Sequence, residues 1–539
     1  MPRPLLEIDG LRVVYGAGPA ATTAVGGVSL QVGQGEILAL VGESGSGKTT
    51  IGGAVLGLLP PGTRVSGSIR FDGQELVGLA GPAYRALRGT RIAYIPQDPA
   101  ASLDPTRTVG SQIAEIFRLH PDRAEGVDVR AAVLELLERV GIDRPELRAR
   151  QYPHQLSGGM RQRVLIAIAF GLKPQLIIAD EPTSALDVTV QRQILDLLDE
   201  LVEQSGTSAI LITHDLAVAT DRASRVVVLR HGEVVDQGDV RSVLSDDSAD
   251  YTRALLGSLL APVGFSAPPA PVDGDEILRV EGLRQEFRSR WRSGPTVTAV
   301  DGVSFSVRAG ETLSIVGESG SGKSSIVRIV SGLVAPVAGS VSLTGAIASG
   351  GRRRVRSRWR RVQLVYQNPA VSLDPRWTVR HSLTAPLRNF GIAPSGPAAL
   401  ARAKELLELV RLPESVLDKR PAELSGGQNQ RVAIARALAP KPLLIVLDEA
   451  LSALDVLTQQ QILRLLAELQ AELGLAYLFV SHDLSVVRDI SHRVAVMKSG
   501  RFVEVGTARE VFESPQSPYT HELLASIPGG RLRELQAVS

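Results

Sequence analysis

Short apolar runs alternate along this chain with segments in which apolar residues recur at helical spacing. The runs at residues 175–179 and 208–213 are dominated by apolar side chains, which is typical of strands buried in a parallel sheet. Residues 109–151 repeat apolar positions with the period of a helix and predict a mostly helical insertion. The alternation predicts an α/β fold with a mostly parallel core. Shorter β runs are expected at residues 5–8, 12–15, 28–32 and 67–71.

The whole pattern occurs twice. Lys323 lies 275 positions after Lys48 (323 − 48), and His482 lies 268 positions after His214 (482 − 214). A repeat of this length indicates a duplicated domain. Residues 261–275, APVGFSAPPAPVDGD, are rich in Pro and Gly and are interpreted as a linker. We therefore expect a first domain at residues 1–260 and a second at residues 276–539.

The composition excludes several kinds of site. The chain has 539 residues, a formal net charge of +2 and no cysteine, so disulfides, Cys-ligated zinc and iron–sulphur clusters are ruled out. A charge this small predicts no bulk attraction to nucleic acid. The longest apolar run, residues 164–170, is far shorter than the roughly 20 residues of a membrane helix. If the protein serves a membrane process, we expect other chains to span the bilayer.

A glycine-rich loop follows an apolar run in each half. Residues 42–50, GESGSGKTT, and residues 317–325, GESGSGKSS, fit a phosphate-binding loop in which backbone N–H groups surround phosphate oxygens. Lys48 is expected to reach the β- and γ-phosphates and Thr49 to ligate Mg²⁺. The predicted nucleotide-binding residues are Gly42, Gly45, Ser46, Gly47, Lys48, Thr49 and Thr50, with Gly317, Gly320, Ser321, Gly322, Lys323, Ser324 and Ser325 in the second half.

Each half also carries an Asp-Glu pair at the end of an apolar run. In phosphoryl chemistry one carboxylate holds Mg²⁺ and a second group orients the attacking water. We expect Asp180 and Asp448 to hold the metal, and Glu181 and Glu449 to be the catalytic glutamates. The alternative, that these acids only cap a following helix, is disfavoured beside a phosphate loop in the same half.

Two further polar residues stand in matching contexts in the two halves. Gln97 and Gln367 each follow a β-like run and are expected to contact Mg²⁺ or the attacking water. His214 and His482 each follow a strand, where an imidazole can donate to the γ-phosphate. A lone histidine or glutamine more often has a structural role. The functional role predicted for both residue types therefore depends on their repetition in matching contexts.

The segments LSGGM at residues 156–160 and LSGGQ at residues 424–428 each open an apolar helix. Ser-Gly-Gly is an ordinary helix N-cap, yet its amides and hydroxyl also form a second anion site. The residues of this predicted site are Ser157, Gly158 and Gly159 in the first half, and Ser425, Gly426, Gly427 and Gln428 in the second.

Together these motifs resemble those of the ATP-binding cassette (ABC) ATPases, over essentially the whole chain and twice. The resemblance implies tandem P-loop NTPase domains, each with a RecA-like core, an antiparallel β subdomain and an α-helical subdomain, that bind ATP and Mg²⁺. Residues 184–187 and 452–455 resemble D-loops, and Tyr15 and Phe287 stand where an adenine-stacking aromatic is expected. The resemblance also implies two composite sites, in which each ATP lies between one half's phosphate loop and the other half's Ser-Gly-Gly turn.

Other segments resemble the peptide/nickel-type importers. These are QDPAASLDP after Gln97, QNPAVSLDP after Gln367, and residues 250–262 and 517–529. The resemblance implies an energy-coupling ATPase in which two subunits are fused, bound to two transmembrane permease subunits on the cytoplasmic face of the cell membrane. An extracytoplasmic substrate-binding protein completes such importers. Peptides are the first expectation for the substrate, with nickel, glutathione and opines left open.

Two positions in the motifs depart from the family's common pattern. Met160 replaces the common signature Gln, and Ala450-Leu451 replaces the Pro-Thr of residues 182–183, so equal turnover at the two sites stays open.

A soluble tandem ATPase acting on ribosomes or DNA is disfavoured by the short linker and the missing cysteines. The arginine-rich run 352–361 can bind a phosphate backbone, but a solvated helical face is favoured and no nucleic-acid partner is expected. A regulatory protein without hydrolysis would lack a glutamate, and neither glutamate is lost.

Overall fold

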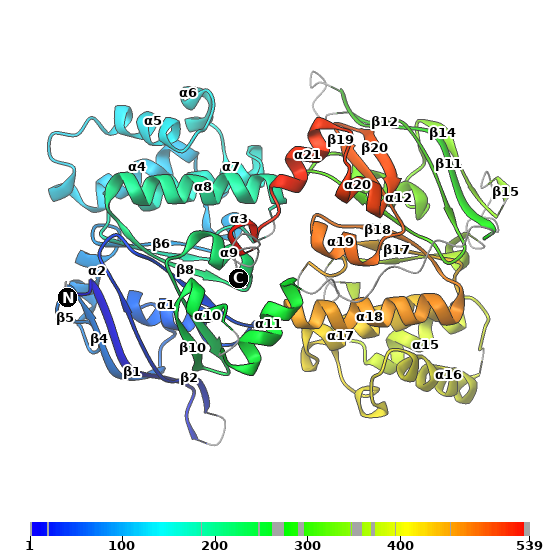
Figure 1. The fold of residues 1–539 in the computed structure, drawn as a ribbon, viewed down its shortest axis with the longest axis horizontal. Helices are drawn as coiled ribbons and strands as arrows, with labels where there is room; N and C mark the ends of the chain where they lie inside the picture. Colours follow the sequence, from blue (N-terminus) through cyan, green and yellow to red (C-terminus); the bar gives the residue numbers. More distant parts are fainter. Residues whose placement is uncertain are drawn as a thin grey trace. The chain divides into compact units, whose positions relative to one another are not determined.

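The chain divides into two compact units, which are described separately in this computed structural model (Figure 1). The residues described are 3–18, 21–184, 186–245, 248–260, 274–288, 296–344, 346–347, 358–367, 372–393, 395–452 and 454–532. Most of the expected linker (261–273), much of the arginine-rich run (352–357) and one residue of each expected D-loop (185 and 453) lie outside them.

The first unit is built on a six-stranded, mostly parallel sheet with the order β10-β9-β3-β8-β7-β6. Only β10 runs antiparallel to its neighbour among these strands. The predicted α/β class with a parallel core is therefore confirmed. The strands are β3 (Ile37–Val41), β6 (Ile92–Ile95), β7 (Leu176–Asp180), β8 (Ser208–Thr213), β9 (Arg225–Arg230) and β10 (Glu233–Asp239).

Alternate residues of the parallel strands face two different cores. Ile178, Ile210 and Ile212 pack in one apolar cluster with the helix after β3, whereas Ile177 and Leu211 pack in another with the helical segment. Successive side chains of a strand point to opposite faces of the sheet, so a strand covered on both faces must be apolar at every position. This is why these runs lack polar alternation.

A four-stranded antiparallel sheet, ordered β2-β1-β4-β5, completes the β structure of this unit. The two runs expected at 5–8 and 12–15 are in fact one strand, β1 (Leu6–Tyr15), with a register shift between Ile8 and Leu11. Gly10 has a φ of 57° there, and a Cβ on Gly67 of the neighbouring strand would lie 2.5 Å from its carbonyl oxygen. The polar Asp-Gly step is thus a β-bulge. The other strands are β2 (Thr22–Val32), β4 (Arg64–Phe71) and β5 (Gln74–Glu75).

The predicted helical insertion is confirmed (Figure 1). It consists of α4 (Val109–Leu119), α5 (Val129–Arg139) and α6 (Pro145–Ala149), followed by α7 (Gly158–Phe170). The helix after the phosphate loop, α1 (Lys48–Leu56), ends at Leu56 because Gly57 adopts a left-handed conformation with φ 60°. Further helices are α2 (Gly81–Leu87), α3 (Pro99–Ser102), α8 (Val188–Ser205), α9 (Leu216–Arg222), α10 (Val240–Val243) and α11 (Asp250–Leu260).

The second unit repeats this architecture. Its larger sheet has the order β16-β17-β18-β13-β19-β20, which matches the first unit strand for strand, and its smaller sheet has the order β12-β11-β14-β15. The strands are β11 (Glu276–Arg288), β12 (Thr296–Arg308), β13 (Thr312–Val316), β14 (Ala338–Leu343), β15 (Ala346–Ile347), β16 (Val362–Val365), β17 (Leu444–Asp448), β18 (Ala476–Val480), β19 (Arg493–Lys498) and β20 (Arg501–Thr507). Its helices include α12 (Lys323–Val330), α15 (Val379–Asn389), α16 (Gly396–Leu409), α17 (Gly426–Leu438), α18 (Val456–Leu473), α19 (Leu484–Ile490), α20 (Ala508–Glu513) and α21 (Pro518–Ala525).

An arginine closes the C-terminal end of the loop helix in each unit. Arg88 donates hydrogen bonds to the carbonyl oxygens of Leu56 and Gly57, and Arg358 donates to those of Ile329 and Val330. Arg358 belongs to the arginine-rich run that was expected to form a solvated face. At this one position the structure gives the run a helix-capping role instead.

No helix in the parts of the chain that the structure describes is both long enough and apolar enough to cross a membrane.

Candidate functional site

The first phosphate loop connects β3 to α1 and holds its lysine against its own main chain. Lys48 is 5% exposed, and its ammonium donates to the carbonyl oxygens of Gly42, at 2.6 Å, and Glu43, at 2.8 Å. A Cβ on Gly42 would collide with the carbonyl oxygen of Leu229, and one on Gly47 would lie 2.6 Å from that of Ala24. Glycine is therefore required sterically at both positions.

The second loop, between β13 and α12, repeats this geometry. Lys323 donates to the carbonyl oxygens of Gly317, at 2.6 Å, and Glu318, at 2.7 Å. Burial lowers the pKa of Lys323, although nearby carboxylates oppose that shift. Cβ atoms on Gly317 and Gly322 would collide with the carbonyl oxygens of Met497 and Ala299.

Each loop presents the N-terminus of its helix without a side-chain cap. The N-cap residues are Gly47 and Gly322, with φ values of 99° and 113°. The first N–H groups of α1 and α12 therefore lack a capping acceptor from these residues, and the helix dipole adds positive potential there. Such a terminus suits a phosphate. The predicted residues Ser46 and Ser321 are buried within the two loops.

Asp180, at the end of β7, lies directly beside the first loop. Its two carboxylate oxygens accept hydrogen bonds from Thr49 Oγ1, at 3.2 Å, and from the Tyr94 hydroxyl, at 3.0 Å. Burial raises the pKa of Asp180, while these two donors act to lower it. A hydroxyl and a carboxylate are the oxygen ligands that Mg²⁺ prefers, so the predicted metal ligands fit that ion. Within the described residues no three His, Cys, Asp or Glu side chains form a metal cluster, so any cation there needs further oxygens.

The equivalent carboxylate in the second unit is supported differently. Leu364 pairs with Val446 as Tyr94 pairs with Ile178, so no hydroxyl stands at this position beside Asp448. Burial, with the charge of Glu449, raises the pKa of Asp448 to about 6, and the charge of Arg328 on α12 acts against that rise. The aspartate of the first unit is thus stabilised by a neutral hydroxyl donor, Tyr94, whereas that of the second unit is stabilised by the charge of a nearby arginine, Arg328.

The glutamates that follow these aspartates have an uncommon backbone conformation. Glu181 and Glu449 have φ values of 45° and 48°, in the left-handed region that non-glycine residues rarely adopt. Their N–H groups donate to Ile212, at 2.9 Å, and Val480, at 2.8 Å, on the adjacent strand. Such strain persists only where surrounding structure enforces it, and it concentrates at functional sites.

Each glutamate side chain meets the predicted glutamine and histidine of its own unit. Gln97 Nε2 donates to Glu181 Oε2 at 2.8 Å, and His214 Nδ1 lies 3.2 Å from Glu181 Oε1. In the second unit the corresponding distances to Glu449 Oε2 are 2.7 Å from Gln367 and 3.6 Å from His482. In each unit the structure therefore brings together three of the predicted residues, the glutamate, the glutamine and the histidine.

The histidine–glutamate pairs perturb the pKa of both partners. Hydrogen bonding to Glu181 raises the pKa of His214, and burial opposes this without cancelling it. Burial alone would raise the pKa of Glu181, but His214, Lys48 and Gln97 outweigh it and the pKa is lowered. The hydrogen bond from His482 similarly lowers the pKa of Glu449. The raised histidine pKa and the lowered glutamate pKa both favour a protonated histidine beside an ionised glutamate.

These shifts predict a pH-dependent stability. The histidine contribution is fully present below the ordinary pKa of 6.5 and is lost as the pH rises through the higher folded-state value. The glutamate contribution is present above 4.5 and is lost as the pH falls through the lower folded-state value. We expect a His214→Gln, His482→Gln chain to melt below the wild type between pH 4.5 and 6.5, with the gap closing at higher pH. A gap that widens with pH in thermal melts would contradict the assigned charges.

The Ser-Gly-Gly turns are helix N-caps in the structure. Ser157 accepts from Met160 N and Ser425 accepts from Gln428 N, each at 3.3 Å. Gln428 returns the bond by accepting from Ser425 N at 3.1 Å, which a methionine at residue 160 cannot do. The capping interpretation is confirmed for both turns, and only the second forms a complete capping box.

Helix α18 and helix α8 pass close to the second glycine of their respective turns. A Cβ on Gly159 would lie 2.5 Å from Val190, and one on Gly427 would lie 2.7 Å from Thr458. Gly158 and Gly426 have more room, with the nearest leucine methyl at 3.5 Å in each case. The second glycine of each turn is therefore a packing requirement of its own helix pair.

The aromatic residues expected near an adenine lie at the ends of β1 and β11. Tyr15 lies with its hydroxyl 3.1 Å from Thr50 Oγ1, which places its ring beside the start of α1. Phe287 is 42% exposed. Tyr15 is partly buried against the core of its unit, and the stacking role of both aromatics stays a prediction.

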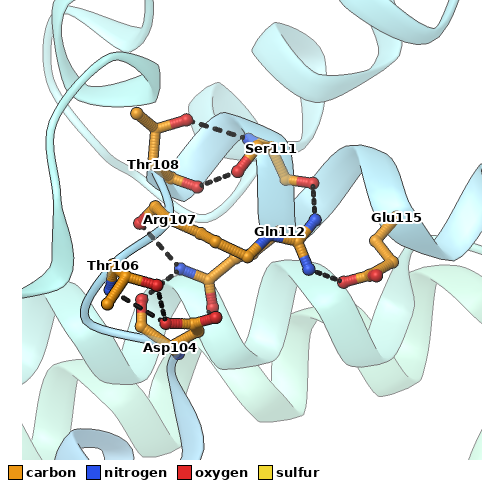
Figure 2. Close-up of polar contacts among 7 residues, drawn as sticks. All are labelled: Asp104, Thr106, Arg107, Thr108, Ser111, Gln112 and Glu115. Carbon is orange, nitrogen blue, oxygen red and sulfur yellow. Dashed lines mark hydrogen bonds and ion pairs between the residues drawn. The ribbon is translucent and has the colours of Figure 1, made fainter.

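A polar network fixes the segment that follows Gln97 to helix α4. The buried Gln112 accepts from Asp104 N at 2.9 Å and donates to the carbonyl oxygens of Asp104 and Arg107. Arg107 in turn pairs with Glu115. Figure 2 shows the whole network, formed by Asp104, Thr106, Arg107, Thr108, Ser111, Gln112 and Glu115. In the second unit the rings of Trp377 and His381 contact each other at the equivalent place, with centroids 4.2 Å apart and ring planes tilted by 57°.

Three tyrosines at these sites carried no functional signal of their own in the sequence. Tyr94 contacts Asp180, and Tyr251 and Tyr519 contact the two phosphate loops. Tyr251 and Tyr519 stand in matching segments, YTRALL and YTHELL, which resemble importer sequences but indicated no role for the tyrosines themselves.

Known proteins resemble this chain over nearly its whole length. The ABC transporter profile matches residues 25–184 and 300–452, and the profile "Oligopeptide/dipeptide transporter, C-terminal region" matches residues 503–536. The chain is 41% identical to "Oligopeptide transport ATP-binding protein OppD" of Mycobacterium tuberculosis, over 97% of this chain and 98% of that protein. It is 42% identical to "Peptidoglycan transport ATP-binding protein YejF" of Agrobacterium fabrum, over 100% and 99%. It is 43% identical to "Glutathione import ATP-binding protein GsiA" of Salmonella typhimurium, over 98% and 90%. With two matched ATPase domains and near full-length relatives, the chain belongs to the ABC transporter family and is one of its tandem ATP-binding ATPases.

Proposed function

We propose that this chain hydrolyses ATP to drive the import of di- or oligopeptides. The observation that carries the proposal is the second matched region, residues 503–536, whose profile describes oligopeptide and dipeptide transporters. The substrates in the names of the three relatives, oligopeptides, peptidoglycan and glutathione, all contain amino acids joined by amide bonds. A short peptide is the chemistry they share.

The site residues divide into binding and catalytic roles. Lys48 and Lys323 bind the phosphates together with the loop amides, and Tyr15 and Phe287 contact the adenine. Mg²⁺ would be held by Thr49 with Asp180, and by Ser324 with Asp448, where it neutralises phosphate charge. Support comes from the 3.2 Å contact between Thr49 and Asp180.

Glu181 and Glu449 orient the attacking water and accept its proton in this proposal. Gln97 and Gln367 hold the glutamate side chains from one side, and His214 and His482 hold them from the other. A carboxylate fixed at two points loses little freedom when water binds, which is how positioning lowers a barrier. The pairing of each phosphate loop with the other half's Ser-Gly-Gly turn stays a prediction from the resemblance.

We further propose two transmembrane permease subunits and an extracytoplasmic substrate-binding protein as partners. The chain would then act at the cytoplasmic face of the cell membrane. Its relatives are named as ATP-binding proteins of transport or import, which supports a place in such a complex. The absence of a nucleic-acid partner stays a prediction.

Uptake in cells that lack this chain tests the substrate. We expect deletion to abolish uptake of a labelled tripeptide and the wild-type chain to restore it, with nickel uptake unchanged. Excess unlabelled dipeptide should compete, whereas excess nickel should not. Normal peptide uptake in the deletion strain, with nickel or opine uptake lost, would show that the peptide proposal is wrong.

A further inference from the structure

A buried tyrosine near the end of each unit touches the phosphate loop of the same unit. Tyr251 is the second residue of α11 and Tyr519 the second residue of α21, and each residue is 6% exposed. The N–H of Glu43 donates to the Tyr251 hydroxyl at 3.3 Å, and the N–H of Glu318 donates to the Tyr519 hydroxyl at 3.2 Å. These contacts join residues more than 200 positions apart in the chain, at separations of 208 and 201.

The peptide unit that the tyrosine contacts is the one that holds the loop lysine. In the first unit this peptide joins Gly42 to Glu43, with its N–H on Tyr251 and its carbonyl oxygen accepting from Lys48 at 2.6 Å. The peptide that joins Gly317 to Glu318 has the same two partners, Tyr519 and Lys323. Each peptide plane is therefore fixed from both ends, once by a hydroxyl and once by an ammonium.

The strand behind the loop holds the tyrosine ring as well as the glycine. The Arg230 guanidinium lies 4.8 Å from the Tyr251 ring centroid, and the Lys498 ammonium lies 4.2 Å from that of Tyr519. The residues just before these cations, Leu229 and Met497, are the ones whose carbonyl oxygens leave room only for glycine in the loop. A cation over an aromatic face is attractive, so the ring is held in place.

Repetition separates this arrangement from ordinary core packing. Around the tyrosines the two segments differ, with Arg253 and Ala254 in one and His521 and Glu522 in the other, and the stacked cation changes from arginine to lysine. The hydroxyl-to-amide contact is nevertheless the same. Burial raises the pKa of Tyr519 to about 12, so its hydroxyl is neutral at physiological pH and acts as a hydrogen-bonding group, not as a charge.

We propose that Tyr251 and Tyr519 are positioning residues of the two ATP sites: each hydroxyl fixes the peptide whose carbonyl holds the loop lysine, and thereby sets the affinity of that loop for nucleotide. The inference rests on the proposed function, because it requires the loops to bind ATP. It gives the transporter-specific region at 503–536, which contains Tyr519, a direct connection to the phosphate loop.

Nucleotide binding to the full-length chain carrying Tyr251→Phe and Tyr519→Phe tests the inference. Phenylalanine keeps the ring and its cation but removes the hydroxyl. We expect the Kd for a fluorescent ATP analogue to rise roughly threefold to tenfold, the scale of one lost hydrogen bond per site. Hydrogen exchange should also become faster in peptides that contain the amides of Glu43 and Glu318, whereas a purely structural tyrosine would leave these amides unchanged.

Matched controls exist within each unit. Tyr84 is a buried tyrosine with a hydroxyl bond to the Leu76 carbonyl at 3.0 Å and an arginine over its ring, and Tyr477 has a bond to the Leu466 carbonyl at 2.8 Å. We expect Tyr84→Phe and Tyr477→Phe to leave the Kd and the loop exchange at wild-type values. If the control variants weaken binding as much as the loop tyrosine variants, the inference is overturned.

A lysine variant distinguishes failure of the inference from failure of the proposed function. Lys48→Ala with Lys323→Ala should abolish nucleotide binding if the loops are the ATP sites. Wild-type nucleotide affinity in that variant would show that both the proposed ATP sites and the inference are wrong. Lost binding in the lysine variant, combined with wild-type affinity and loop exchange in the tyrosine variant, would overturn the inference alone.

Discussion

A chain that carries Glu181→Gln and Glu449→Gln is expected to bind ATP but to hydrolyse it roughly 10²- to 10⁴-fold more slowly than the wild type. Glutamine has nearly the same shape and leaves the phosphate loops untouched. Its amide cannot accept a proton from water, and it replaces the carboxylate that the histidine of each unit faces. ATP should therefore remain bound, and substrate uptake should stop.

Steady-state phosphate release and the nucleotide retained after gel filtration measure the two effects. Glu200→Gln, at an exposed position on α8, is the matched control and should keep the wild-type rate. The single variants show whether one intact glutamate supports turnover. A wild-type rate in the double variant would show that the catalytic assignment is wrong.

Gly42→Ala is expected to disable the first loop by steric collision. The added Cβ would meet the carbonyl oxygen of Leu229 and would lie 2.7 Å from Ser46 Oγ. Because this carbonyl belongs to the main chain of β9 and Ser46 is buried, we expect the loop itself to shift. We expect a loss of roughly 1–3 kcal/mol in the free energy of unfolding, the usual cost of overpacking. Because the carbonyl of Gly42 also holds Lys48, nucleotide binding at this loop should fall more than stability does.

Gly257→Ala provides the control, since a Cβ on Gly257 meets nothing within 4 Å. This glycine lies inside α11, where alanine should stabilise the helix by roughly 0.5–1 kcal/mol. Urea unfolding and ATP titration distinguish the two variants. If Gly42→Ala has the same free energy of unfolding and the same ATP affinity as the wild type, the close approach of Leu229 does not constrain the loop.

The sequence predicted the parts of the site that depend on local pattern. Apolar strands of a parallel sheet end at one edge, so acids and histidines placed directly after those runs had to lie near a loop at the same edge. This is why Asp180, Glu181 and His214 are found together. The predicted fold class and family are confirmed for the same reason, because both depend on repeated short motifs.

Features that depend on distant contacts were not predicted. Tyr94 is an ordinary apolar-strand residue until the register of β6 against β7 places it two positions before Asp180 across the sheet. The bulge in β1 was interpreted as a break because its polar Asp-Gly step interrupts the run, and only the opposing Gly67 explains it. The end of α1 depended on the left-handed conformation of Gly57, which no periodicity shows.

The lysine of each phosphate loop has a consequence for product release. Lys48 and Lys323 each donate to two carbonyls of their own loop, so an incoming phosphate competes with the main chain for the same protons. Binding is then an exchange of hydrogen bonds, and the loop recovers its own bonds when nucleotide leaves. A buried ammonium with such an internal alternative is never stranded without an acceptor, which would be costly. An ATPase that turns over repeatedly benefits from this arrangement, because the lysine can bind ATP tightly without making the release of ADP slow.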